Sequence, residues 1–191
     1  MKQKLSLLLI VLFTFFSCSK PVPQKDDNTI IKSENWKTKV ENTLLLFGHR
    51  NWIVVADGAY PKQSNPAIKT IAVDAHQLEV VEFVNEVIKK SSHVQATIFL
   101  DKEMAFVAEK DAKGIDKYRT DLDKILETKK VQTMFHEDII KELASSAKVF
   151  DVLIIKTNLT IPYTSVFFQL DCGYWNSESE TNLRTKMNSL K

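Results

Sequence analysis

The chain alternates between two hydrophobic periods, and this alternation constrains its fold more than any other feature. Short apolar runs with the spacing of strands occupy 52–56, 67–73, 94–100, 131–135, 149–157 and 165–172. Other segments repeat their apolar residues every three or four positions, as on one face of a helix: 36–47, 78–90, 114–130 and 136–147. Together they predict a single α/β domain with a mostly parallel sheet and helices on both faces. We expect the last two strands to form an antiparallel hairpin.

The first 17 residues have the layout of a secretory signal. Lys2 and Lys4 precede an apolar run that is too short to span a bilayer, and the run ends in Ser17-Cys18. This ending resembles a bacterial lipoprotein cleavage box, in which the cysteine becomes the first mature residue and is acylated. An uncleaved signal anchor with an incidental cysteine is the alternative.

Three regions follow from the lipoprotein interpretation. Residues 1–17 are predicted to be a signal peptide, 18–35 a flexible, polar tether that starts at the lipid attachment site Cys18, and 36–191 one domain. The protein is then expected to be lipid-anchored to a bacterial cell envelope, with its domain in the periplasm or at the cell surface. Which membrane leaflet holds the lipid stays open.

Composition argues against several classes of partner and cofactor. Of the 26 Lys and Arg residues, two lie in 1–17, so 24 remain against 24 Asp and Glu. A neutral chain gives no electrostatic reason to expect nucleic acid. Only four glycines occur, so a Gly-rich phosphate loop is absent. No CxxC or HExxH spacing appears, and we therefore predict neither a metal nor an organic cofactor.

Two distant segments share a resemblance to one family. "LLLFGHRNWIVVADGAYP" (44–61) and "VLIIKTNLTIPYTSVFFQLDCGY" (152–174) resemble the opening and closing motifs of the RbsD/FucU sugar mutarotases. Their order and separation extend the resemblance over nearly all of 36–175. It implies an RbsD-like fold and a reaction that interconverts anomers, or pyranose and furanose forms, of a free monosaccharide. It also implies a ring-shaped homo-oligomer with sites near subunit contacts.

The implied reaction needs only proton transfer. The ring opens when the anomeric hydroxyl loses a proton and the ring oxygen gains one, and such acid–base help contributes about 100- to 10,000-fold. The resemblance makes His49 the principal acid–base group, since histidine titrates near neutral pH, with Asp57 and Tyr163 as its catalytic partners. Each has a plainer alternative: a histidine at a helix end, an aspartate in a turn, and a tyrosine packed at a sheet edge.

The substrate-binding residues implied by the resemblance are Ser165, His136 and Lys141. Ser165 stands where the family commonly has an asparagine. Lys141 is displaced by one position on its predicted helix, which rotates its side chain by about 100° and turns it away from the family's direction. These departures keep a rival interpretation open: a non-catalytic sugar-binding or oligomeric envelope protein on the same fold. The identity of the sugar does not follow.

Geometry separates the first two catalytic candidates. A fully extended segment from His49 to Asp57 spans about 25 Å at roughly 3.3 Å per residue. One straight strand therefore cannot bring both side chains to one sugar. Either the flanks of the strand curl back, or the two residues meet from different subunits.

Overall fold

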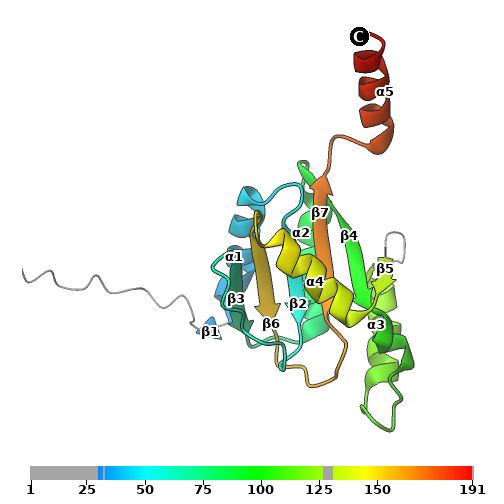
Figure 1. Ribbon diagram of the computed structural model, residues 1–191. Coiled ribbons are helices and arrows are strands. Elements are labelled where there is room, and N and C mark those ends of the chain that lie inside the picture. The colour runs from blue at the N-terminus through cyan, green and yellow to red at the C-terminus, as the bar shows by residue number, and fades with distance from the viewer. Residues whose placement is uncertain (1–29, 32, 127–130, 191) are drawn as a thin grey trace, which may run out of the picture.

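The computed structural model describes residues 30–31, 33–126 and 131–190. One seven-stranded sheet has the order β1-β3-β6-β2-β7-β4-β5 (Figure 1). The strands are β1 (Ile30–Ile31), β2 (Trp52–Ala56), β3 (Ile68–Val73), β4 (Val94–Asp101), β5 (Val131–Met134), β6 (Val152–Lys156) and β7 (Val166–Cys172). All run parallel except β7, which is antiparallel to both neighbours, β2 and β4. The predicted single α/β domain with a mostly parallel sheet is confirmed.

Helices cover both faces of the sheet, as predicted. They are α1 (Ser33–Leu46), α2 (Gln77–Lys90), α3 (Ile115–Leu126), α4 (His136–Ser146) and α5 (Ser177–Asn188), with a short 3-10 helix at Lys102–Phe106. The core on one face contains buried residues of α1, α2 and α3, whereas α4 contributes Ile139 and Leu143 to the core on the other. All five residues of β2 are buried, because it lies between these two layers. Its unbroken apolar sequence suits that position.

The expectation of a C-terminal hairpin is wrong. The strands β6 and β7 are antiparallel to each other, but β2 lies between them in the sheet. The reason is visible in β7 itself, where Phe167 is buried in the core on one face and Phe168 in the core on the other. A strand that buries both faces belongs inside the sheet, and the connection 157–165 is long enough to pass the end of β2.

The structure describes little of the predicted N-terminal regions. The lipoprotein prediction, including Cys18, and most of the predicted tether lie outside the described residues, as do 127–130 of the third predicted helix. Within the tether range, β1 pairs with β3 and α1 already begins at Ser33. No helix in the described ranges is long and apolar enough to cross a membrane.

The C-terminal helix α5 was not anticipated, and it stands away from the sheet (Figure 1). Its start does have a sequence signal. The side chain of Asn176 accepts a hydrogen bond from the backbone N–H of Ser179 at 2.8 Å, and asparagine is among the preferred residues at this capping position.

A buried amide holds the connection between β6 and β7. Gln77, only 2% exposed, donates from Nε2 to the Thr164 carbonyl at 2.5 Å and to the Tyr118 hydroxyl at 2.9 Å. Its Oε1 accepts from the Thr157 hydroxyl at 2.9 Å. Both ends of the connection are therefore tied to the start of α2.

We expect Gln77→Leu to lower the free energy of unfolding by about 2 to 3 kcal/mol, because buried partners lose their hydrogen bonds. Urea unfolding at neutral pH measures the change. Gln132→Leu is the matched control, because Gln132 is exposed on the edge strand β5 and should shift stability by less than about 0.5 kcal/mol. Equal midpoints for the two variants would contradict the role given to Gln77.

Candidate functional site

Polar residues lie at the same end of four neighbouring strands of the sheet. Asp57 follows β2, Ser165 precedes β7, Asp101 ends β4 and His136 follows β5. These strands are adjacent in the order β2-β7-β4-β5. Since β7 alone runs in reverse, its amino end meets the carboxyl ends of the others. We call this side of the sheet, formed by the carboxyl ends of the parallel strands, the carboxyl edge, and the opposite side the amino edge. Ligands of such sheets usually bind at the carboxyl ends of the strands.

Asp57 occupies a tight turn that faces the start of β7. Its Oδ1 accepts from the backbone N–H of Ala59 at 2.8 Å, and its Oδ2 accepts from the Ser165 hydroxyl at 3.4 Å. The turn lies directly against the β6–β7 connection, because the N–H of Gly58 donates to the Leu159 carbonyl at 2.7 Å. A Cβ on Gly58 would lie 3.1 Å from that same carbonyl oxygen. The close approach explains the glycine after Asp57.

His136 forms a pair with a buried carboxylate. Its Nδ1 lies 3.1 Å from Oδ1 of Asp101, whose side chain is only 1% exposed, while the His136 side chain is 32% exposed. The backbone N–H of His136 donates to both carboxylate oxygens of Glu103 at 3.1 Å. The ring and the backbone of His136 are thus both fixed. Because Asp101 engages Nδ1, Nε2 is the nitrogen that can meet a ligand.

Asp101 is an unusual carboxylate. Burial raises the pKa of Asp101 to about 6, the charge and hydrogen bond of His136 oppose that rise, and the nearby carboxylates of Glu103 and Asp57 add to it. Its Oδ2 is buried and has no hydrogen-bond partner among the described residues. Burial also raises the pKa of Tyr60, to about 12, with further contributions from Asp101 and Asp57. The charges of Asp57 and Asp101 thus both raise the pKa of a neighbouring group at the carboxyl edge.

Tyr163 lies beside the histidine in a strained backbone conformation. Its ring centroid is 5.7 Å from that of His136, with the rings nearly perpendicular at 82°. Its φ of 57° is left-handed, which costs a residue other than glycine about 1 kcal/mol or more. A neighbouring hollow of about 270 Å³ has a largely apolar lining: Lys102, Glu103, Phe106, Val107, Phe135 and Tyr163. The carboxyl edge therefore combines a histidine–carboxylate pair, polar side chains and aromatic surface.

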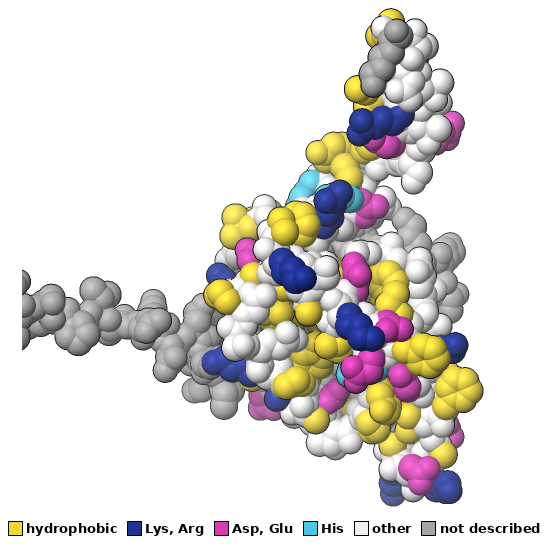
Figure 2. Space-filling view, viewed as in Figure 1, with side chains coloured by type: hydrophobic (Ala, Val, Ile, Leu, Met, Phe, Trp, Pro, Cys, Tyr) yellow, Lys and Arg dark blue, Asp and Glu magenta, His cyan; other side chains and the backbone are white. Residues whose placement is uncertain are grey.

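His49 lies at the amino edge, at the opposite end of the strands, just before β2. Figure 2 shows histidine side chains at the surface in two separated places, one near the start of α5 and one among Asp and Glu side chains. Nδ1 of His49 is 2.6 Å from Oδ1 of Asp171, at the far end of β7. The flanks of β2 do not curl back, so one chain does not bring His49 to Asp57 and Tyr163.

The other sequence-based candidates divide between the site and the surface. Ser165 and His136 join Asp57 and Tyr163 at the carboxyl edge. Lys141 is instead paired with Asp138 at 3.0 Å on α4, and its side chain is 73% exposed. The roles of all these residues stay predictions.

Two residues of the site were missed from the sequence, Asp101 and Glu103. Asp101 had a usable signal, because it ends an apolar strand much as Asp57 follows one. Glu103 lies just after it in the 3-10 helix and has no comparable pattern. No group of three or more His, Cys, Asp or Glu residues suited to a metal ion occurs in the part of the chain that the structure describes.

Comparison with known proteins identifies one family. The RbsD / FucU transport protein family matches residues 32–172, a range that includes His49, Asp57 and Tyr163 and excludes β1 and α5. No curated protein matches the chain significantly.

Three solved structures are similar to this chain. RbsD of Bacillus subtilis complexed with D-ribose is 15% identical with a TM-score of 0.50, over 70% of this chain and 92% of that one. FucU of Bifidobacterium longum is 15% identical with a TM-score of 0.49, over 70% and 94%. The fucose mutarotase of Streptococcus pneumoniae, in complex with L-fucose, is 24% identical with a TM-score of 0.46, over 68% and 89%. The first likeness supports the fold alone, whereas the family match spans most of the sequence: the chain belongs to the RbsD/FucU family.

Proposed function

We propose that this protein is a monosaccharide mutarotase that opens and closes the ring of a free sugar at the carboxyl edge of its sheet. The observation that carries the proposal is the pair of buried Asp101 and partly exposed His136, next to Asp57, Ser165 and Tyr163. Family membership supports the same activity. RbsD of Bacillus subtilis, which shares the fold, was solved with D-ribose, so a free aldopentose is the first substrate to test.

The proposed chemistry starts at the anomeric hydroxyl. Nε2 of neutral His136 takes its proton, the carbonyl forms at C1, and the bond between C1 and the ring oxygen breaks. The ring oxygen takes a proton from a second acid, for which the Tyr163 hydroxyl is our candidate within this edge. The open aldehyde turns, and the same transfers in reverse close the ring on either face or at another hydroxyl.

The other groups hold the sugar and the imidazole. Ionised Asp101 accepts the Nδ1 proton of His136 and stabilises the imidazolium that forms. Asp57 accepts hydrogen bonds from sugar hydroxyls, and Ser165 can donate or accept. A hemiacetal needs no redox step and no covalent intermediate, so these transfers are sufficient.

In this proposal His49 serves a site on another copy of the chain. Within one chain it lies at the wrong edge of the sheet, while the family motif that contains it is intact. A homo-oligomer that joins the amino edge of one copy to the carboxyl edge of the next would bring His49 to a sugar held by Asp57. Sedimentation of a fully active monomer would rule this part out.

Magnetisation-exchange NMR on free D-ribose, L-fucose and D-glucose tests the function. We expect the full chain to accelerate exchange between the forms of at least one of them at neutral pH. The non-catalytic alternative, favoured by Ser165 at the position of a family asparagine, predicts line broadening of one sugar without faster exchange. No effect on any of these sugars, over a range of protein concentrations, would refute both sugar functions for this panel.

A further inference from the structure

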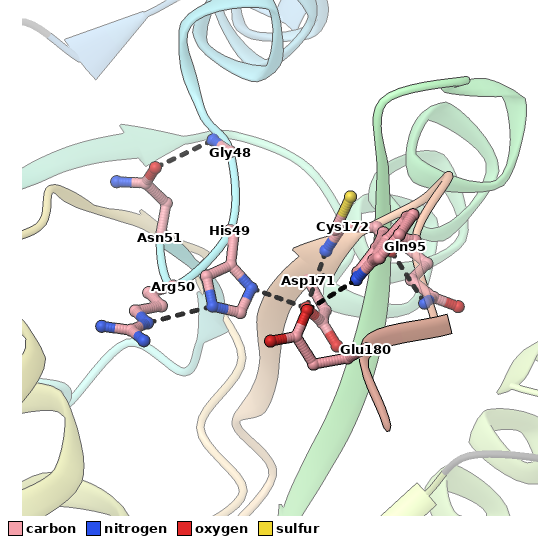
Figure 3. Close-up of polar contacts among 9 residues, drawn as sticks. Gly48, His49, Arg50, Asn51, Gln95, Asp171, Cys172 and Glu180 are labelled. Atoms are coloured by element: carbon pink, nitrogen blue, oxygen red, sulfur yellow. Dashed lines mark hydrogen bonds and ion pairs between the residues drawn. The ribbon is translucent and has the colours of Figure 1, made fainter. Parts of the chain in front are cut away.

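A second histidine–carboxylate pair lies at the amino edge of the sheet. Nδ1 of His49 and Oδ1 of Asp171 are 2.6 Å apart, and Nε of Arg50 lies 3.0 Å from Nε2 of the same ring (Figure 3). Asp171 was not among the residues indicated by the sequence. The pair repeats the arrangement at the carboxyl edge, where Nδ1 of His136 meets Oδ1 of Asp101.

The contacts assign the proton on the His49 ring. The guanidinium of Arg50 is always charged and has only donors, so Nε2 of His49 must accept. A neutral ring that accepts at Nε2 carries its proton on Nδ1, which then donates to Asp171. This is the tautomer that a general base acting through Nε2 requires.

The carboxylate of Asp171 is held in place before any ligand arrives. Its Oδ1 also accepts from the backbone N–H of Cys172 at 2.7 Å. The loop with His49 is tied to the same strand end, because the N–H of Arg50 donates to the Leu170 carbonyl at 2.8 Å and the N–H of Leu170 donates to the Asn51 carbonyl at 2.9 Å. Both partners are therefore fixed through their backbones.

The space around the pair suits a polyhydroxyl ligand. A cavity of about 480 Å³ adjoins it, and its lining offers donors, acceptors and one aromatic ring, including Arg50, Glu142, Ser145, Phe150 and Gln169. The guanidinium of Arg50 lies 5.7 Å from the Phe150 ring centroid. Arg50 has a left-handed φ of 77°, a conformation that costs a residue other than glycine about 1 kcal/mol or more.

We propose that Asp171 is the positioning residue of His49 in the mutarotase reaction. It holds the imidazole proton on Nδ1 and keeps Nε2 as an acceptor for a sugar hydroxyl at the shared site, while Arg50 occupies Nε2 until that hydroxyl replaces it as donor. This inference rests on the proposed function for its catalytic consequence. The tautomer itself is a property of the free protein.

The first test reads the tautomer directly. Long-range ¹H–¹⁵N correlation spectra of the full chain distinguish Nδ1–H from Nε2–H rings, and His49→Gln assigns the His49 signals. We expect the Nδ1–H form in the wild type and in Arg50→Ala, where Asp171 alone holds it, and a mixture rich in Nε2–H when Asp171→Ala is combined with Arg50→Ala. Asp151→Asn is the matched control, because Asp151 is exposed near the same edge and should leave the tautomer unchanged. A His49 ring that stays in the Nδ1–H form in the double variant would overturn the proposal.

The second test separates positioning from mere support of the loop. At saturating sugar, Asp171→Ala should slow exchange roughly tenfold, a part of the 100- to 10,000-fold that acid–base groups contribute, with little change in the half-saturating sugar concentration. Asp171→Asn can still accept from Nδ1–H and should recover part of the rate. An effect on sugar affinity alone, equal in both variants, would contradict positioning. If the wild type accelerates no sugar, the proposed function fails, and the tautomer measurement still decides the role of Asp171.

Discussion

Replacing His136 with Gln is expected to slow the protein-catalysed exchange of sugar forms by about 100-fold or more, because general acid–base groups contribute on that scale. Glutamine can still begin α4, and its backbone N–H can still donate to Glu103 as that of His136 does. It can form hydrogen bonds with a sugar but cannot exchange a proton near neutral pH. The loss should therefore appear in the exchange rate at saturating sugar, with a smaller effect on affinity.

The chain offers a matched control for this substitution. His76 also lies at the start of a helix, as the capping residue of α2, and its side chain forms no capping hydrogen bond. His76→Gln should exchange sugars at the wild-type rate. Wild-type exchange by His136→Gln would instead remove His136 from the mechanism and return the principal role to His49.

Asp101→Asn should make the protein more stable at neutral pH and less active. The carboxylate has a folded pKa of about 6 against an ordinary value of 3.8, so the native state binds more protons than the unfolded state between these values. Stability contributed by this group therefore falls as pH rises from about 4 to 6. Above pH 6 the ionised Asp101 lowers the free energy of unfolding by its full amount, on the order of 3 kcal/mol for this difference in pKa.

Urea unfolding at a series of pH values from 4 to 8 measures this effect. We expect Asp101→Asn to lack the decline between pH 4 and 6 and to exceed the wild type by about 1 to 3 kcal/mol at pH 7.5, since asparagine cannot ionise. Asp111→Asn, at an exposed position, should follow the wild-type curve. A variant less stable than the wild type at pH 7.5 would show that ionised Asp101 is a net stabilising group.

Activity should move the other way in the same variant. An asparagine side chain cannot supply the negative charge that stabilises imidazolium at His136, so we expect exchange to slow at least tenfold, within the range of acid–base catalysis. Wild-type exchange should also weaken as pH falls through about 6, where Asp101 takes up a proton. The opposed effects on stability and rate are typical of residues retained for function.

The sequence predicted the layers of this fold better than its connections. Periodicity identifies β2 as a buried strand and α1 as a helix, because burial on one or both faces leaves a direct trace in residue spacing. It does not encode which strands are neighbours. The position of β7 between β2 and β4 depends on the summed packing of Phe167 and Phe168 in two separate cores, which no local pattern contains.

The candidate site follows the same division. Asp57, Tyr163 and Ser165 were found because they lie near strand ends within recognisable motifs. The pairing of His136 with Asp101 was not, because it joins residues 35 positions apart and exists only because β4 and β5 are neighbours. The expected length of the segment from His49 to Asp57 excluded a straight strand that brings both residues to one sugar, but it left open whether the flanks of the strand curl back.

The reversed strand β7 has a consequence for symmetry. It begins next to Ser165 beside Asp57 and ends near Asp171 beside His49, so one strand contributes to two unlike surfaces. Copies that complete each other's sites can join these surfaces across a two-fold axis, where each copy gives one surface and receives the other, or head to tail in a heterologous contact. Repetition of such a contact closes a ring when its rotation divides a full turn, and otherwise grows an open filament.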